Sequence, residues 1–340
     1  MIKDKFKGVL KILLEKESDL ILKKYKPRVV LVRGESGRAQ TRYALETALS
    51  KFYFVRSGEE QSLTVLGFDS EARSFLEWLL VLVEGVALIV LPNHYPEWLI
   101  LESEFDHADF IVEVGVFDGF VPKDYEVVYD ENNLPKGITF NVESAGVDYP
   151  VYLDSVVGEA QIGPVLSAFK LSKELGEHLS IVAKAFSNIE PLKGHTSLVE
   201  GIKGSVIIDD TFDSSPNLLL MGLKTLISLD KPKRRVAVIG DMLGLDKNSI
   251  EEHKKIGQEI SKDIDLLVTV GIRSRYIAEG ALNNGFNESK IFQFEDSKKA
   301  GDFMQNLIAE GDTVYVSGSR GMYMEDFVEE VMAHPETIYD

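Results

Sequence analysis

The chain has 340 residues and carries 55 acidic against 37 basic side chains, a net charge of −18 at pH 7. This charge argues against a nucleic-acid partner, because a phosphate backbone would be repelled. The chain has no cysteine, which excludes thiol catalysis, thiolate metal sites and disulfides. The length predicts two domains. We recognise no signal peptide and no apolar run of about 20 residues, and therefore expect a cytoplasmic protein.

Residues 2–24 predict a helix that is rich in lysine and has one apolar face. A basic amphipathic helix can lie on an anionic membrane surface. Most amphipathic helices instead pack their apolar face against the rest of the protein. We favour packing on the following domain over membrane-surface contact, and treat residues 1–26 as a separate N-terminal helix.

A strand, a glycine-containing turn and a helix follow. Residues 27–32 read P-R-V-V-L-V, residues 33–41 read R-G-E-S-G-R-A-Q-T, and a helix continues to about residue 51. This order is typical of a phosphate-binding loop, in which backbone N–H groups surround an anion. Gly34 and Gly37 would allow such a loop to form. The alternative is a turn into the helix that binds nothing.

Short strands dominate the region up to residue 153. We predict a helix at about 70–84 and strands at 52–56, 86–91, 98–102, 110–114, 125–129, 138–142 and 149–153. Glu102 ends one of these strands with a carboxylate. Helices at 159–176 and 179–186 precede a domain boundary near residues 191–196.

Strands and helices alternate in the last third of the chain, which predicts a doubly wound parallel sheet. The strands are expected at 206–208, 235–240, 265–270, 290–294 and 313–317, and the helices at about 216–229, 250–261, 274–283, 298–309 and 322–332. Ser215 before Pro216 predicts an N-cap, and Ser249 with Glu252 predicts a capping box.

Two of these strand ends carry polar side chains where open α/β sheets bind ligands. Asp209 and Asp210 end the first strand and could contact a ribose, an amine or a metal. The alternative is a capped, solvated turn. Arg320 follows the last strand and could pair with a substrate carboxylate, unless it forms only a surface ion pair.

Three motifs in this order resemble the Mur ligase family. D-D-T-F-D-S-S-P at 209–216 is similar to D-D-S-Y-N-A-N-P, G-D-M-L-G-L at 240–245 to G-D-M-L-E-L-G, and S-G-S-R-G at 317–321 to K-G-S-R-G. The most similar member adds D-alanyl-D-alanine to the muramoyl tripeptide. The resemblance implies an α/β fold, with a shortened P-loop-like central domain at 27–192 and a Rossmann-like C-terminal domain at 193–340.

The resemblance also implies roles in the central domain. Arg38 stands where the family has a phosphate-binding lysine, and Ala39 where it has the hydroxyl that binds Mg²⁺. Thr41 lies two positions further on and is kept as a nucleotide-binding candidate. Glu102 matches a glutamate that holds Mg²⁺ and is the candidate metal ligand. No residue matches the histidine and carbamylated lysine of the family's second metal site.

In the C-terminal domain, Asp209 and Asp210 match the family and become nucleotide-binding candidates. His195 stands where the family has an arginine that reaches the nucleotide, and Asp213 where it has an asparagine that helps to hold it. Ser317 replaces the motif lysine. The substrate candidates Ser319 and Arg320 remain where the incoming amino compound would sit.

A Mur ligase phosphorylates a carboxylate with ATP, and an amine then attacks the acyl phosphate, so catalysis depends on charge neutralisation at the phosphates. Because several such contacts are replaced, we favour a Mur-ligase-like protein of peptidoglycan precursor synthesis with lost or strongly reduced ligase activity and a binding or regulatory role. It would need no cofactor, and its partner would be another cell-wall synthesis protein or a muramoyl-peptide precursor.

The alternative is an active ligase that adds D-alanyl-D-alanine, or a similar amino compound, to a carboxylate. Such an enzyme would use ATP and Mg²⁺, and would depend on Arg38, Glu102 and Asp210.

Overall fold

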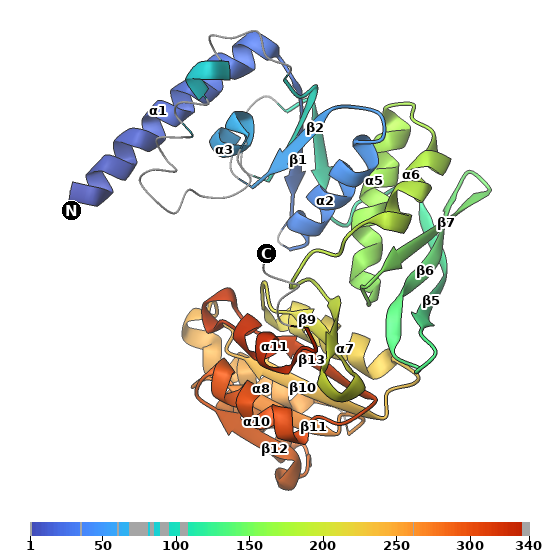
Figure 1. Cartoon of the computed structure of the whole chain (residues 1–340), viewed down its shortest axis with the longest axis vertical. Helices are drawn as coiled ribbons and strands as arrows, with labels where there is room; N and C mark the ends of the chain where they lie inside the picture. Colours follow the sequence, from blue (N-terminus) through green and yellow to red (C-terminus); the bar gives the residue numbers. More distant parts are fainter. Residues whose placement is uncertain are drawn as a thin grey trace. The chain divides into compact units, whose positions relative to one another are not determined.

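The structure is a computed structural model that describes residues 2–34, 36–59, 61–67, 81, 85–88, 95–102, 108–260 and 262–334. The chain forms two compact units (Figure 1). The first unit contains residues 1–123, 141–151 and 162–187, and the second contains 124–140, 152–161 and 188–340. The second unit thus takes two short stretches from the region that the sequence analysis assigned to the central domain.

A four-stranded sheet forms the centre of the first unit. Its described strands are all parallel and lie in the order β2 (Val55–Gly58), β3 (Trp98–Leu101), β1 (Arg28–Arg33) and β4 (Phe110–Glu113). The central strands β1 and β3 are apolar and buried, as is typical of parallel strands covered on both faces.

Helices cover this sheet. They are α1 (Ile2–Tyr25), α2 (Arg38–Leu49), α3 (Gln61–Leu66), α5 (Ile162–Glu174) and α6 (Leu179–Ala185). Leu14 and Ile21 of α1 are buried in one core with Leu31 and Leu99 of the sheet, as the packing interpretation of the N-terminal helix predicts. Helix α2 packs against α5. Among the described residues, no helix is long and apolar enough to cross a bilayer.

One predicted strand of the first unit is wrong. Residues 85–88 are helical, although a strand was expected at 86–91, and residues 89–91 lie outside the described residues. The predicted helix at 70–84 also lies outside them, apart from residue 81, which is helical. Short apolar runs fit a buried helix as well as a buried strand, so hydrophobicity alone could not separate the two.

A three-stranded sheet follows β4 in the chain. Its strands β5 (Val121–Tyr129), β6 (Pro135–Ser144) and β7 (Val147–Asp154) pair in sequence order. All three were predicted, with shorter bounds.

The second unit is built on a six-stranded sheet. The order is β12 (Ile291–Phe294), β11 (Leu266–Val270), β10 (Arg234–Gly240), β13 (Asp312–Ser317), β9 (Ser205–Asp210) and β8 (Ser197–Gly201). Every described pair is parallel except β8 with β9. Strand β8 was not predicted, because S-L-V-E-G is short and only partly apolar.

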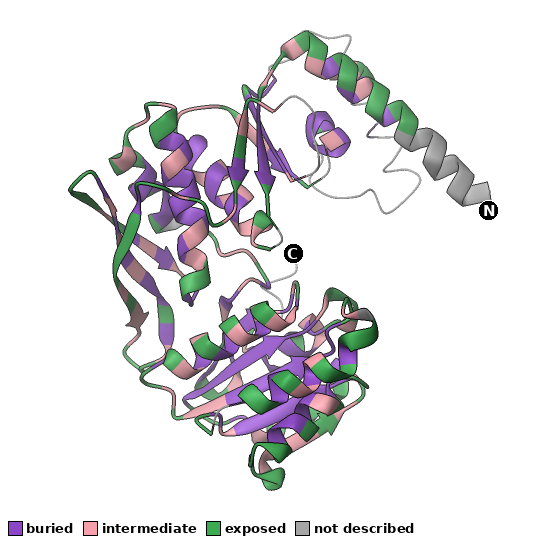
Figure 2. Ribbon diagram, turned by 180° about the vertical axis from the view of Figure 1, so that it is seen from behind, coloured by how far each residue is buried: buried purple, intermediate pink, exposed green. Residues whose placement is uncertain are grey.

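Five helices lie on the two faces of this sheet. They are α7 (Pro216–Ser228), α8 (Ser249–Glu259), α9 (Arg275–Asn283), α10 (Ser297–Leu307) and α11 (Glu325–Val331). Helices α7, α8 and α9 share a core with Ile208 and Ala237, whereas α10 and α11 share one with Ile207 and Val236. Neighbouring strand residues therefore serve opposite faces, and the four central strands β11, β10, β13 and β9 are buried along most of their length (Figure 2). The predicted doubly wound sheet is confirmed.

Of the two predicted helix caps, the one at α7 is confirmed and the one at α8 is wrong. Ser215 accepts a hydrogen bond from the Leu218 N–H at 3.4 Å, which confirms the N-cap of α7. The capping box is wrong, because Ser249 is already the first residue of α8 and Asn248 is its N-cap, with no capping hydrogen bond from its side chain.

Gly222 of α7 allows the helix to approach the sheet closely. A Cβ atom there would lie 2.0 Å from the hydroxyl oxygen of the fully buried Tyr315. We expect Gly222→Ala to lower the free energy of unfolding by about 2 kcal/mol, despite the higher helix propensity of alanine. Denaturant titration measures this change. Gly244→Ala is the control, since its Cβ would meet nothing within 4 Å, and an equal effect of the two substitutions would contradict the packing argument.

Candidate nucleotide and substrate site

Gly34 and Gly37, between β1 and α2, both lie close to Val114. A Cβ atom on Gly34 would lie 2.8 Å from the Cβ of Val114, and Gly37 has φ of 75° at the N-cap of α2. Arg38 and Ala39 are the first two residues of the helix. Thr41, a nucleotide-binding candidate, is fully buried, and its hydroxyl oxygen has no hydrogen-bond partner among the described residues.

Glu102, the candidate metal ligand, is engaged by arginine. The Arg42 Nε donates to the Glu102 Oε1 at 2.6 Å, and the two side chains are only 16% and 10% exposed. The Arg38 Nη1 donates to the backbone oxygen of Glu102 at 3.4 Å. Sequence analysis missed Arg42, because it lies beyond the motif and one helical turn after Arg38.

The described residues around Glu102 do not fit a Mg²⁺ ion. The Glu102 carboxylate already forms an ion pair with the Arg42 guanidinium, and the Ala39 side chain has no atom that could bind a metal. Throughout the part of the chain that the structure describes, no three acidic, histidine or cysteine side chains are grouped so that they could hold a metal.

In the second unit, Asp209 connects the end of β9 to the loops beside it. Its Oδ2 accepts from the Gly194 N–H at 3.1 Å, and its Oδ1 accepts from the Thr211 hydroxyl at 2.6 Å and the Thr211 N–H at 3.2 Å. Burial raises the pKa of Asp209, although these hydrogen bonds act in the opposite direction. The carboxylate therefore fixes the two loops that flank the candidate site.

Asp210, the neighbouring candidate, accepts a hydrogen bond at 2.8 Å from the hydroxyl of the fully buried Tyr315 on β13. Burial raises the pKa of Asp210 to about 7, and the negative charge of Asp209 adds to this shift. Asp210 can therefore exchange a proton near neutral pH.

The Phe212 ring contacts two of the predicted site residues, His195 and Arg320. Its ring centroid lies 4.5 Å from that of His195, and the Arg320 guanidinium carbon lies 5.2 Å from the same ring. The Phe212 N–H donates to the Gly194 oxygen at 3.1 Å, which holds the two loops side by side. Sequence analysis missed Phe212, and its place inside the D-D-T-F motif was the available signal. Asp213 is exposed and accepts from the Ser214 N–H at 2.8 Å.

The substrate candidate Ser319 joins the ends of β13 and β10. Its N–H donates to the Asp241 oxygen at 3.1 Å, and its Oγ accepts from the Leu243 N–H at 2.9 Å. Asp241 in turn accepts from the N–H groups of Arg273 and Ser274 at 3.0 and 2.7 Å. Three strand ends are therefore tied together beside Arg320.

His253 of α8 stabilises the loop that follows β10 at the same edge of the sheet. Its Nε2 accepts from the Met242 N–H at 3.0 Å, so its Nδ1 carries the proton and donates to the Ser249 oxygen at 2.6 Å. Burial lowers the pKa of His253. The ring is a neutral structural group that positions the loop after β10.

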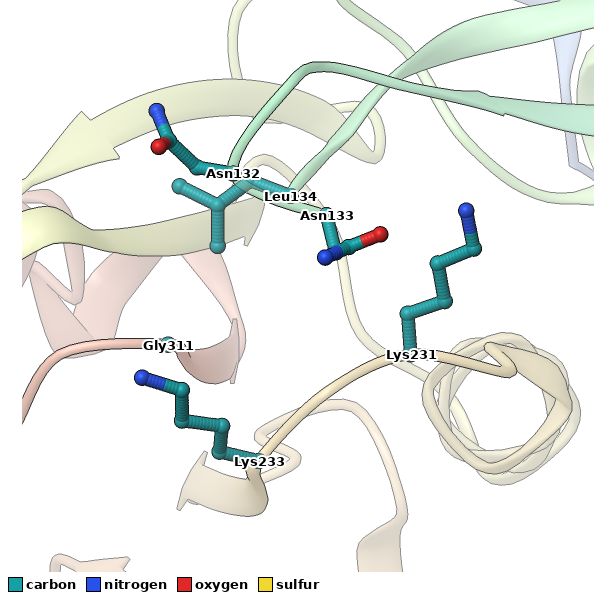
Figure 3. Close-up of a pocket in the computed structure, with 6 residues that line it drawn as sticks. All are labelled: Asn132, Asn133, Leu134, Lys231, Lys233 and Gly311. Carbon is teal, nitrogen blue, oxygen red and sulfur yellow. The ribbon is translucent and has the colours of Figure 1, made fainter.

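A cavity of about 400 Å³ lies at the opposite, amino edge of the same sheet (Figure 3). It is lined by Asn132, Asn133, Leu134, Lys231, Lys233 and Gly311. Lys233 pairs with Glu310 at 2.9 Å, and Lys231 lies over the Tyr129 ring. The cavity includes none of the motif residues.

Comparison with known proteins agrees with this geometry. Residues 196–320 match the family model of the Mur ligase, glutamate ligase domain. Residues 196–320 of the second unit are therefore similar to this Mur ligase domain, in agreement with the fold expected from the three motifs.

The particular relatives are UDP-N-acetylmuramoyl-tripeptide–D-alanyl-D-alanine ligases. The protein from Bacillus subtilis is 25% identical over 213 residues, 62% of this chain and 46% of the relative. The protein from Haemophilus influenzae is 25% identical over 239 residues, 67% of this chain and 50% of the relative. The chain thus spans about half the length of these curated relatives.

Solved structures show the same fold. The MurF ligase from Thermotoga maritima, in complex with ADP, has a TM-score of 0.70 at 18% identity and covers 94% of this chain and 83% of that chain. A folylpolyglutamate synthase from Mycobacterium tuberculosis, also with ADP, has a TM-score of 0.64 at 11% identity, with 96% and 97% covered. The P-loop-like central domain and the Rossmann-like C-terminal domain are therefore confirmed as the fold class.

The raised pKa of Asp210 predicts a pH-dependent stability. Its pKa is about 7 in the folded chain against an ordinary value of 3.8, so between these values the folded chain keeps a proton that the unfolded chain has released. The contribution of Asp210 to stability is therefore full at low pH and is lost as the pH rises towards 7. We expect the free energy of unfolding of the wild type, relative to Asp210→Asn, to fall by about 3 kcal/mol between about pH 4 and pH 7.

Denaturant titrations across this range measure the difference. Asp213→Asn removes an exposed carboxylate from the following loop and is the control. A wild-type minus Asp210→Asn difference that stays constant with pH would contradict the assignment.

Proposed function

We propose that this chain is a Mur-ligase-like protein of peptidoglycan precursor synthesis in the cytoplasm, with lost or strongly reduced ATP-dependent ligase activity and a binding or regulatory role. Its partner would be another cell-wall synthesis protein or a muramoyl-peptide precursor. The curated relatives support the pathway, since they are named as ligases that join D-alanyl-D-alanine to a UDP-N-acetylmuramoyl tripeptide.

The observation that carries the loss of activity is the start of α2. Arg38 and Ala39 are its first two residues, where a phosphate-binding loop needs a lysine and a metal-binding hydroxyl. Arg38 donates to the Glu102 backbone, and the methyl group of Ala39 cannot bind a cation. Loss of one such contact typically costs about 3 kcal/mol in the transition state, or about a hundredfold in rate.

The second unit supports a retained scaffold. Asp209, Asp241 and Ser319 keep the strand ends joined, and Arg320 stays beside Phe212. These hydrogen bonds keep the strand ends in a fixed order and satisfy carboxylates that would be costly if buried unpaired. We therefore propose that this edge still recognises a ligand or a protein.

An active ligase is the second candidate. The retained Asp209, Asp210 and Arg320 favour it, and it would use ATP with Arg38, Glu102 and Asp210. Because the described residues do not fit a metal at Glu102, this candidate would need phosphate charge to be neutralised by arginine alone.

Phosphate release from ATP separates the two candidates. The purified chain would be assayed with ATP, Mg²⁺, the UDP-muramoyl tripeptide and D-alanyl-D-alanine, beside the Bacillus subtilis relative under the same conditions. We expect a rate at least about a hundredfold below that of the relative.

Arg38→Ala is the matched variant for this assay. The residual rate should not change in this variant, since a background reaction does not depend on the loop. A rate within about tenfold of the relative's, lost in Arg38→Ala, would contradict the proposal and establish an active ligase.

A further inference from the structure

We infer that the first unit carries its own cation, the Arg42 guanidinium, at the position where the family resemblance places a metal, and that this position takes no divalent ion. The inference deepens the proposed function, because it rests on Glu102 as the matching metal position. It concerns the cation alone and requires no nucleotide to be bound.

The guanidinium is held by groups from three elements. Arg42 lies on α2, its Nε donates to Glu102 after β3 at 2.6 Å, and its Nη1 donates to the Ser57 Oγ on β2 at 3.0 Å. Ser57 in turn donates to the Glu46 Oε2 at 2.5 Å. Glu46 follows Arg42 by one helical turn and is linked to the guanidinium through the Ser57 hydroxyl.

Partial burial favours this pairing. Arg42 and Glu102 are 16% and 10% exposed, and a charge in such surroundings requires a partner. A divalent ion on the Glu102 carboxylate would have to displace Arg42 and leave its guanidinium buried without a counter-charge. The ion pair therefore competes directly with metal binding at this position.

The same geometry predicts what happens when the arginine is removed. The Glu102 carboxylate and the Ser57 hydroxyl would then face the vacated space, with the Glu46 carboxylate bonded to Ser57, and oxygen ligands of this kind suit Mg²⁺ and Mn²⁺. Arg42→Met should therefore create a divalent-ion site that the wild type lacks. Glu102 should be essential to that site.

The test uses Mn²⁺ alone as the probe and thermal unfolding as the readout. Wild type, Arg42→Met and the double variant Arg42→Met/Glu102→Gln would be melted in EDTA, and in millimolar MnCl₂ against KCl of equal ionic strength. We expect the Tm of the wild type to change by less than about 1 °C with Mn²⁺. The Tm of Arg42→Met should rise by about 3 °C or more, and the double variant should lose this rise.

Arg275→Met is the matched control, because it removes an arginine from the exposed pair with Glu295, and it should give no Mn²⁺ response. Two results would overturn the inference: a wild-type Tm that rises with Mn²⁺ and loses this rise in Glu102→Gln, or a folded Arg42→Met that gains no response. If Arg42→Met does not fold, the change in Tm that Mn²⁺ causes in the wild type and in Glu102→Gln still tests the inference. No nucleotide is present, so failure here is distinct from the ATP turnover that would contradict the proposed function.

Discussion

The ion pair between Arg42 and Glu102 links three elements of the first unit. It joins helix α2 to the carboxyl end of β3 and, through Ser57, to β2. The strand end at which a phosphate site would need a metal is therefore closed by a side chain of the protein itself. A partly buried pair of this kind is costly to break, because either partner alone would keep an uncompensated charge.

In the second unit, by contrast, the motif residues are retained and stabilise the edge of the sheet. Its motif residues keep the edge of the sheet in order: Asp209 holds the Gly194 and Thr211 loops, Ser319 joins two strand ends, and His253 supports the loop between them. Most of these contacts are made to backbone groups. The similarity to Mur ligases is accordingly more continuous in this unit, where the motifs maintain the fold as well as line a site.

Much of the fold could be predicted from the sequence, because alternating buried strands and capped helices leave a clear pattern, as Val206–Ile208 and Ser215–Pro216 show. The exceptions have physical reasons. Residues 85–88 are an apolar run that suits either element, and Ser249 lies inside the helix it was expected to cap. The site was harder to predict. Arg42 and Phe212 act through contacts with residues distant in the sequence, and no local pattern encodes such contacts.

A double-mutant cycle on Arg42→Met and Glu102→Gln tests the central claim most directly. Denaturant unfolding of the wild type, both single variants and the double variant gives the coupling energy of the pair. We predict a coupling of about 2 kcal/mol or more, against about 0.5 kcal/mol or less for the exposed pair Arg275 and Glu295. A coupling near zero would mean that the two side chains are energetically independent, and would contradict the account of a built-in cation.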